Sequence, residues 1–310
     1  RMILSYSKML SEITDDIYKK KIMFLLNNNW TGRTDYYFPA QTSVNLEKCH
    51  FTKLQNYNYR FAIKNTIDYK RGILFNFIDS SAENKSAVIF KDFSIYYINI
   101  NCSHEYFYGS IFDISFSDKE IIICDTFMAS GNKVNTLSYV DRMSEASYFI
   151  NSLVESDIKI KTLDYSHDIN LFSNIDDNEE LFIIPNNLPI TTGINYSCFK
   201  WKPSDRYSFN LSVSENESDI DVYTTNFKKL KLFAKIKWDT PEGKEQIEQI
   251  KSLDNYKNGC MIRFNLDLSN NKIIIEGVDT DKTIPTTIRS IEKILHIKRE
   301  NITFQEISAY

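Results

Sequence analysis

The chain has little cysteine and histidine, and neither residue type is clustered. The five cysteines are scattered with no Cys-x-x-Cys pair, and the four histidines are spread along the chain. Structural zinc sites and disulfide frameworks need such residues at short, regular spacings. The sequence therefore argues against a zinc site, a histidine-based metal site and a disulfide framework, and it favours a reducing compartment.

Long apolar runs and an excess of basic charge are also absent. No run approaches the roughly 18 apolar residues of a membrane-spanning helix, and we recognise no signal peptide. We therefore expect a soluble, intracellular protein, with nuclear and cytoplasmic locations both open. The formal net charge is −4, so no global field draws the protein to nucleic acid. Any such binding must come from a local basic patch, and we expect neither membrane association nor DNA binding.

Glycine and proline are scarce as well, at 8 and 6 residues, whereas aromatic residues make up 14% and supply bulky core material. A length of 310 residues suits one large domain or two ordinary ones. An acidic stretch rich in serine and asparagine at residues 214–221 indicates a domain boundary. We predict a first domain over residues 1–215, with an N-terminal helical segment at residues 1–37, and a second domain over residues 222–310.

Hydrophobic periodicity predicts a mixture of helices and antiparallel strands. Amphipathic helices are expected at residues 12–26 and 138–154. Strands of the first domain are expected at residues 59–64, 73–77, 87–90, 94–98, 120–125 and 181–184. In the second domain, strands at residues 229–238, 260–267 and 272–278 are enough for a small five-stranded barrel of the oligonucleotide-binding (OB) type. A closing helix is expected at residues 286–296, directly after Pro285.

Two lysines one residue apart are the pattern on which the functional interpretation depends. Lys200 and Lys202 stand in an extended, apolar-flanked Cys-Phe-Lys-Trp-Lys-Pro segment at residues 198–203. Strand side chains alternate with a period of two, so both lysines are predicted on one face. Two ammonium groups on one face lie in water or against an anion, and phosphate is the common anion. The spacing alone also fits a solvated edge strand.

The Lys-Trp-Lys-Pro segment and the Phe-x-Leu strand that follows it at residues 209–211 resemble the late lysine motif of mRNA capping guanylyltransferases. These enzymes share a superfamily of covalent nucleotidyltransferases with the ATP- and NAD-dependent nucleic-acid ligases. Phe38-Pro39-Ala40-Gln41 is similar to a Phe-Pro-Gly-x-Gln segment ahead of the family's catalytic lysine. The resemblance covers about residues 38–307. It implies an α+β fold, with a nucleotidyltransferase domain of ATP-grasp-like antiparallel sheets and helices before a C-terminal OB-fold barrel.

In that superfamily, a lysine at a strand end attacks the nucleotide α-phosphate, and it must be deprotonated to do so. Lys64 stands at the corresponding strand end. The usual context is Lys-x-Asp-Gly-x-Arg, but this chain lacks the Asp-Gly, and Arg71 lies two residues too late. A bulged loop would still let Arg71 reach a ribose. Lys64 also fits an ordinary lysine at the end of a strand.

The remaining family motifs are partly kept. Asp125 matches the aspartate that ends the base-stacking strand, and Glu179 matches the acid before a Leu-Ile-Phe strand. Glu180 replaces the glycine that follows this acid, and a second carboxylate there is expected to repel nucleotide phosphates. Lys282 and a following proline match the Asp-Lys-x-x-Pro ending of the family, in which the arginine that contacts pyrophosphate has become Asp279.

These departures remove parts of the machinery for metal-assisted nucleotidyl transfer. Family acids are replaced by Thr66 and Ser110, and Asp279 reverses the charge of an arginine. Loss of one electrostatic stabiliser typically lowers the rate by about 100- to 1000-fold. The resemblance therefore implies a guanylyltransferase-like protein with a degenerate site, which binds a nucleotide, an RNA cap or a partner without forming the adduct. Gly131 and Arg142 match scaffold positions of the family.

Two alternatives stay open at this point. In an active GTP:RNA guanylyltransferase, Lys64 would carry GMP, Lys200 and Lys202 would hold the α-phosphate, Lys282 would assist the pyrophosphate, and Glu179 would take Mg²⁺ or Mn²⁺. GTP would then be the substrate, although the sequence does not separate GTP from ATP or a methylated cap. In the other alternative, the chain is a structural subunit of a capping or transcription complex. An RNA 5′ end or cap and capping or transcription proteins are the expected partners.

Overall fold

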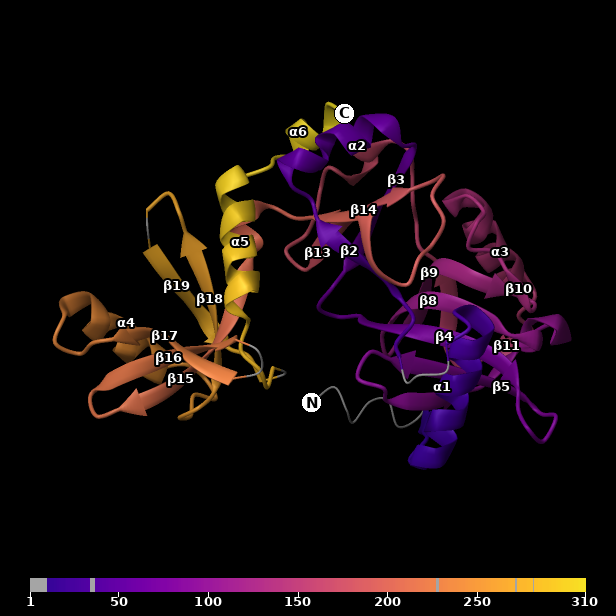
Figure 1. The fold of residues 1–310 in the computed structure, drawn as a ribbon, viewed down its shortest axis with the longest axis horizontal. Coiled ribbons are helices and arrows are strands. Elements are labelled where there is room, and N and C mark those ends of the chain that lie inside the picture. Colours follow the sequence, from indigo (N-terminus) through magenta and orange to yellow (C-terminus); the bar gives the residue numbers. More distant parts are fainter. Residues whose placement is uncertain (1–9, 34–36, 227–228, 271, 281) are drawn as a thin grey trace. The chain divides into compact units, whose positions relative to one another are not determined.

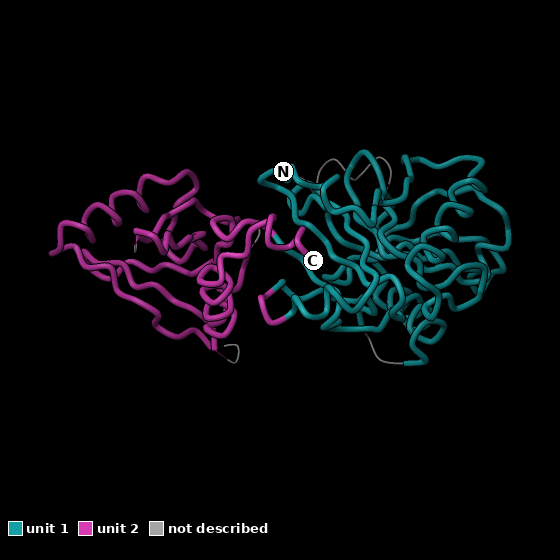
Figure 2. Tube along the Cα trace, turned by 90° about the horizontal axis from the view of Figure 1, so that it is seen from above, with its two compact units in different colours: residues 1–46, 50–201, 310 teal, residues 47–49, 202–309 magenta. Residues whose placement is uncertain are grey.

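The computed structural model describes residues 10–33, 37–226, 229–270, 272–280 and 282–310. The chain divides into two compact units, which Figure 2 shows in different colours. Unit 1 comprises residues 1–46, 50–201 and 310, and unit 2 comprises residues 47–49 and 202–309.

A large, mainly antiparallel sheet, sheet A, forms most of unit 1 (Figure 1). Its strands are β1 (Ser11–Glu12), β4 (Lys70–Ile78), β5 (Asn84–Phe90), β6 (Ile95–Ile98), β8 (Ser110–Phe116), β9 (Glu120–Ala129), β10 (Asn132–Lys133) and β12 (Lys159–Thr162). They are ordered β1-β6-β5-β4-β8-β9-β10, and β12 joins β9 in parallel. The central strands are buried over most of their length, so both faces of the sheet contact apolar side chains.

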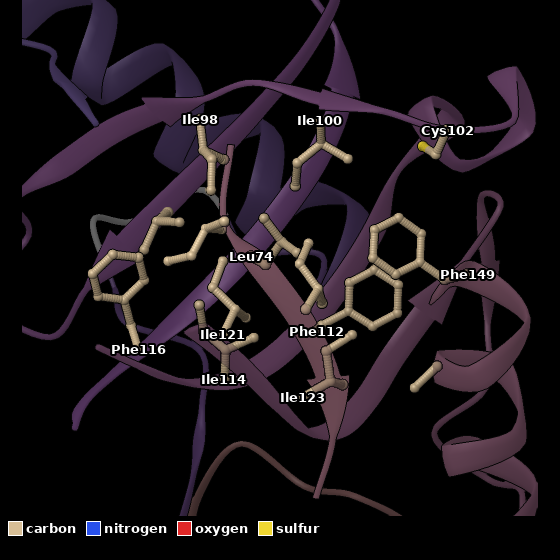
Figure 3. Close-up of a cluster of buried hydrophobic side chains, with 14 of the residues drawn as sticks. Leu74, Ile98, Ile100, Cys102, Phe112, Ile114, Phe116, Ile121, Ile123 and Phe149 are labelled. Atoms are coloured by element: carbon tan, nitrogen blue, oxygen red, sulfur yellow. The ribbon is translucent and has the colours of Figure 1, made fainter. Parts of the chain in front are cut away.

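One face of sheet A packs against helix α3 (Tyr139–Asn151), which confirms the helix predicted at residues 138–154. Ser138 caps this helix by accepting a hydrogen bond from a backbone amide of the first turn. The ring of Phe149 stacks on that of Phe112 with a centroid separation of 4.7 Å. Figure 3 shows these two rings within a cluster of leucine and isoleucine side chains from the sheet.

The opposite face packs against helix α1 (Asp16–Trp30). This helix was predicted at residues 12–26, and it begins later because the side chain of Asp15 caps it by accepting amide hydrogen bonds from the first turn. Trp30 stacks on Phe127 of β9 at a centroid separation of 5.0 Å. Large aromatic contacts therefore fix helices on both faces of sheet A.

A second, four-stranded sheet, sheet B, completes unit 1. Its strands are β2 (Gln41–Asn45), β3 (Tyr59–Asn65), β13 (Glu179–Pro185) and β14 (Gly193–Trp201). The order is β2-β14-β13-β3, with β2 parallel to β14 and the other pairs antiparallel. Ala62 and Cys198 of sheet B share one buried cluster with Cys124 of β9 and Tyr139 of α3. Sheets A and B therefore pack face to face at this point.

Smaller elements complete unit 1. They are α2 (Phe51–Asn56), the paired strands β7 (Ile100–Asn101) and β11 (Glu155–Ser156), and the 3₁₀ helices η4 (His104–Tyr108) and η5 (Ile169–Phe172). Two further 3₁₀ helices, η3 (Lys48–His50) and η6 (Ser204–Arg206), fall mostly or wholly within unit 2.

Unit 2 is built on a five-stranded antiparallel sheet. Its elements are β15 (Ser208–Asn216), β16 (Asp219–Asn226), β17 (Lys229–Ile236), α4 (Pro241–Lys251), β18 (Met261–Asp267), β19 (Lys272–Val278), α5 (Ile288–Glu300) and α6 (Phe304–Ser308). The strand order is β17-β16-β15-β18-β19, with a helix between the third and fourth strands of unit 2 in chain order. This is the order of an OB-type Greek key, and no pairing joins β17 to β19 among the described residues. The predicted α+β class with a C-terminal OB-like domain is confirmed.

The two units divide between Trp201 and Lys202, and not within residues 214–221 as the composition predicted. The acidic stretch is the turn between β15 and β16, where Asn216 lies opposite Asp219. A tight hairpin turn and an interdomain linker both favour small polar residues, so composition alone did not separate them. Among the described residues, no helix is both long enough and apolar enough to span a membrane.

Candidate functional site

The predicted nucleophile Lys64 and the predicted phosphate ligand Lys200 lie on one face of sheet B. In the strand register, Lys64 is opposite Glu180, and Phe182 is opposite both Ala62 and Lys200. Opposite residues share a face, and so do residues two apart along a strand. The ammonium of Lys64 lies 4.3 Å from the centroid of the Phe182 ring. The structure therefore brings the two lysines to a common surface, which we call the inter-sheet site together with Glu180, Phe182, Arg71 and Cys198.

Glu180 is the immediate partner of Lys200. The distance between Lys200 Nζ and Glu180 Oε2 is 3.2 Å, and the Glu180 side chain is only 9% exposed. The sequence led us to expect that Glu180 would repel phosphate, but it does more than that. It occupies, as an anion, a position next to the lysine that a phosphate would need. An incoming phosphate has to displace this carboxylate.

Glu179 lies on the other side of the strand. Consecutive strand residues point to opposite faces, so Glu179 points away from the face that carries Lys64 and Glu180. Its Oε2 accepts a hydrogen bond of 3.1 Å from the amide of Asp176 and thereby closes the turn before β13. The predicted metal ligand is thus not brought to the inter-sheet site.

Arg71 ties sheet A to sheet B. Its Nε and Nη2 donate to the two oxygens of Asp113, at 3.0 and 2.7 Å, and Nη2 also donates to the backbone carbonyl of Gln41 in β2. Burial works against the charge of Arg71, but Asp113 more than offsets it, so the pKa of Arg71 is raised. Its guanidinium is already used by a bidentate carboxylate, which is among the strongest partners an arginine can have.

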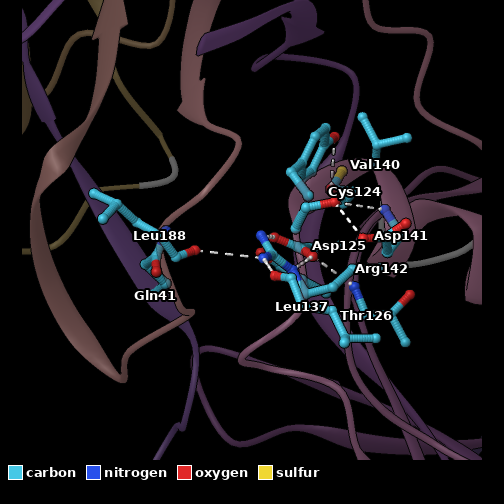
Figure 4. A network of polar contacts seen from close by, with 12 residues as sticks. Gln41, Cys124, Asp125, Thr126, Leu137, Val140, Asp141, Arg142 and Leu188 are labelled. Atoms are coloured by element: carbon cyan, nitrogen blue, oxygen red, sulfur yellow. Dashed lines mark hydrogen bonds and ion pairs between the residues drawn. The ribbon is translucent and has the colours of Figure 1, made fainter. Parts of the chain in front are cut away.

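Asp125 lies opposite Asp113 in the register of β8 and β9, but its carboxylate is bound by Arg142. Arg142 of α3 donates to its two oxygens at 2.8 and 3.1 Å, and the arginine side chain is only 2% exposed. Figure 4 shows the guanidinium between Asp125 and the backbone carbonyl groups of Leu137 and Leu188, to which Nη1 donates. Burial raises the pKa of Asp125, and Arg142 opposes that shift. Asp125, which was predicted to contact the nucleotide, is therefore a buried structural residue that attaches α3 to β9 through Arg142.

The last two predicted ligands lie in unit 2. Strand β14 ends at Trp201, so its period of two does not extend to Lys202. The ammonium of Lys202 lies 5.0 Å from the centroid of the Tyr207 ring. Lys282 donates its backbone amide to Asp279 at 3.2 Å. The carboxylate of Asp279, which replaces a family arginine, also pairs with Arg263 at 3.2 Å.

Sequence reasoning did not assign Cys198 of the inter-sheet site, nor Asp113, the partner of Arg71. Asp113 carries no local motif, and only the strand register places it near Arg71. Cys198 is buried, and burial raises its pKa to about 11, while Lys64 and Arg71 oppose that shift. The thiol therefore lies within electrostatic reach of both cations, although it is itself neutral at ordinary pH. No pattern in the sequence marks either residue.

The site does not fit a metal-bound triphosphate in the conformation described. Of its three basic side chains, Lys200 and Arg71 each have a carboxylate partner within the chain. Among the described ranges, no cluster of three or more His, Cys, Asp and Glu side chains is placed to hold a metal ion. We derive no metal-assisted step from this geometry.

No protein-family model matches the chain, and no curated protein matches its sequence. Among solved structures, the chain is similar to the ligase domain of LigD from M. tuberculosis, with 8% identity, a TM-score of 0.29, and coverage of 79% of this chain and 95% of that one. It is also similar to the ATP-dependent DNA ligase from bacteriophage T7 in complex with ATP, with 10% identity, a TM-score of 0.36, and coverage of 78% and 98%. These values are too low to argue from, so function is argued below from the residues of this chain.

Proposed function

We propose that this chain is a guanylyltransferase-like protein that binds a nucleotide or an RNA cap at the inter-sheet site without forming a covalent lysyl–nucleotide adduct. The observation that carries the proposal is the ion pair between Lys200 and Glu180. A lysine that should neutralise the α-phosphate is already neutralised by the chain itself. The resemblance of the lysine segments to capping guanylyltransferases supports a nucleotide or an RNA cap as the ligand. The ion pair supports the absence of nucleotidyl transfer to Lys64.

A phosphate that binds Lys200 must displace the carboxylate of Glu180. If Lys200 turned to a phosphate, the buried Glu180 carboxylate would lose its ion pair with this ammonium, and the loss of one partner by a buried polar group typically costs about 1–3 kcal/mol. A loss of about 1–3 kcal/mol in the transition state corresponds to roughly 5- to 140-fold in rate, at about 1.4 kcal/mol for each factor of ten. A weak, reversible contact that leaves the Lys200–Glu180 ion pair intact avoids this cost, whereas in-line attack on an α-phosphorus held by Lys200 does not.

One observation favours the active alternative. Within the described part of the chain, Lys64 makes no ion pair with a carboxylate, and its recorded contact is with the Phe182 ring. A nucleophilic amine must be free to lose its proton and to attack the α-phosphorus while the bond to pyrophosphate breaks. Lys64 therefore remains the residue to test for a phosphoramidate bond to GMP.

The decisive experiment is incubation with radiolabelled GTP, and separately ATP, with Mg²⁺ or Mn²⁺, followed by a denaturing gel. We expect no labelled band from the folded wild-type chain. A band that is lost in Lys64→Ala and kept in Lys53→Ala, a matched surface lysine, would overturn the proposal in favour of an active guanylyltransferase.

A thermal-shift titration separates binding from a purely structural role. A ligand that binds only the native state stabilises it by about 2.7 kcal/mol at a concentration of 100 times Kd. We expect GTP or a cap analogue to raise Tm in the wild-type chain and to do so less in Lys64→Ala. No shift with GTP, ATP or cap analogue would instead support a structural subunit of a larger assembly.

A further inference from the structure

The edge strand β17 of unit 2 is exposed in a way that strands of a closed barrel are not. Seven of its eight residues are exposed, and only Ile236 is partly covered. Leu230, Leu232 and Phe233 are 62%, 51% and 45% exposed. Isolated apolar residues on a surface are normal, but three large ones within four consecutive positions form a patch.

The backbone of this strand is available on one side. β17 is the end strand of its sheet and pairs only with β16 in the described part of the chain. Its outer side therefore presents a row of N–H and C=O groups to which another extended segment can add. Phe233 has no residue opposite it in β16 and therefore forms a β-bulge. The bulge adds one residue to β17 and interrupts the regular alternation of its side chains.

The charge of the strand has one sign. Lys229, Lys231, Lys235 and Lys237 fall at or directly after β17, and no acidic residue lies among them. Lys235 pairs with Asp219 at 3.6 Å. For the other three, no ion pair with a described residue is recorded. A ligand that lies along this edge therefore meets alternating ammonium groups and apolar side chains.

We propose that β17 is a docking edge for an extended acidic segment of a partner protein, in which Asp or Glu alternates with aliphatic residues and which adds to the sheet as a further strand. Main-chain hydrogen bonds supply affinity in this mode of recognition, and alternate side chains supply specificity. Acidic positions of the segment would lie near the lysines, and its aliphatic positions would cover Leu230 and Leu232. The proposal does not depend on the function proposed for unit 1.

Two other occupants fit the edge less well. A second copy of the chain would place two lysine-rich strands side by side, and like charges opposite each other are destabilising. Single-stranded nucleic acid gains affinity from stacking on aromatic platforms, but the exposed side chains here are mainly aliphatic. Nucleic acid would also leave the row of backbone groups unused. The acidic peptide uses the charge, the apolar patch and the backbone together.

The test uses the full chain and a fluorescein-labelled peptide of about ten residues, the upper length of a usual strand, in which glutamate alternates with valine. Fluorescence anisotropy measures its Kd. We expect the double variant Lys229→Glu/Lys231→Glu to weaken binding by about tenfold or more, because two attractive contacts become repulsive. Lys257→Glu, a single charge reversal at an exposed lysine of the loop after α4, should leave the Kd unchanged, whereas Lys231→Glu alone should weaken binding.

Two further measurements distinguish strand addition from simple charge attraction. N-methylation of alternate peptide amides on the pairing edge should abolish binding, and bound peptide should slow hydrogen exchange of β17 amides. Strand addition would be overturned if the peptide still bound after N-methylation on either of its edges. It would also be overturned if a peptide with all its glutamates in one block and all its valines in another bound equally well. Absence of peptide binding, with or without binding of oligouridine of about a dozen nucleotides, would overturn the proposal altogether.

Discussion

The inter-sheet site of unit 1 and the β17 edge of unit 2 carry similar numbers of basic side chains but differ in how those charges are satisfied. In unit 1, Arg71 and Lys200 each contact a carboxylate of the chain at 2.7 and 3.2 Å. On β17, Lys229 and Lys231 are exposed and make no recorded ion pair with described residues. Basic residues therefore indicate an available anion-binding site only where no carboxylate of the same chain already pairs with them.

The largest effect is expected deep in unit 1, where a paired cation is fully buried. Arg142→Met leaves Asp125 as a buried carboxylate without its guanidinium, and we expect a loss of about 3–5 kcal/mol in the free energy of unfolding. The measurement is urea denaturation followed by far-UV circular dichroism. The loss should be smaller at about pH 4 than at about pH 8, because a buried, unpaired carboxyl takes up a proton more readily.

The double variant Arg142→Met/Asp125→Leu is the control for this prediction. It removes both charges, so it should recover most of the stability lost in the single variant. If Arg142→Met alone lost less than about 1 kcal/mol, a value typical of exposed pairs, the contrast between buried and exposed cations would not hold.

The Lys200–Glu180 pair should show an asymmetry between its two members. Lys200→Met leaves a buried anion and should destabilise the chain by about 1–3 kcal/mol, as measured by urea denaturation. Glu180→Gln removes the competing anion and should strengthen GTP binding by about tenfold, since one partly buried charge pair with phosphate becomes available. Isothermal titration calorimetry measures the second effect. Equal GTP affinity in wild type and Glu180→Gln would show that Glu180 does not compete for the lysine.

Local patterns predicted the elements of the fold better than their charge partners. The helix after Ser138 and the lysine positions of β3 and β14 follow from periodicity and capping, which act over a few residues. Asp113 and Arg71 are 42 positions apart and meet only through the register of β4 and β8. The partner of each cation is therefore set by long-range strand pairing, which a single sequence does not reveal.

The same limit explains the two predicted ligands that the fold uses elsewhere. Asp125 and Glu179 were assigned from motif order, but the first is committed to Arg142 and the second faces away from Lys64. Strand alternation fixes which of two adjacent acids faces the site, and a one-residue change in alignment exchanges them. Sequence reasoning marked both acids of β13, but the one that it assigned to the metal does not face Lys64.

A half-exposed pair in sheet A should give an intermediate, pH-dependent effect. Glu120 accepts from Lys161 Nζ at 2.8 Å and from Tyr69 Oη at 2.7 Å, and the Lys161 bond is the main reason why the pKa of Glu120 is lowered. A carboxylate with a lowered folded pKa adds stability that is fully present above its unfolded pKa, about 4.3, and is lost as the pH falls through the folded value.

Lys161→Met should therefore reduce stability by less than about 1 kcal/mol near pH 7, the usual range for an exposed pair. The difference between variant and wild type should shrink as the pH falls below about 4. Thermal unfolding across this range measures both trends. A difference that stays constant with pH would mean that Lys161 acts through packing of its aliphatic stem, and not through the charge of Glu120.

The smallest stability effect is expected on the β17 edge, where the comparison is sharpest. Lys231 is exposed, and its ammonium has no carboxylate partner among the described residues. Lys231→Met therefore removes a positive charge without leaving a carboxylate unpaired. Surface changes of this kind usually alter the free energy of unfolding by no more than about 0.5 kcal/mol. Urea denaturation of Lys231→Met beside Lys200→Met tests the contrast directly, because both replace an ammonium with the same thioether. If Lys231→Met lowered the free energy of unfolding as much as Lys200→Met, an anionic group of the chain itself would have to contact Lys231. The lysines of β17 would then stabilise the fold and would not be available to a partner.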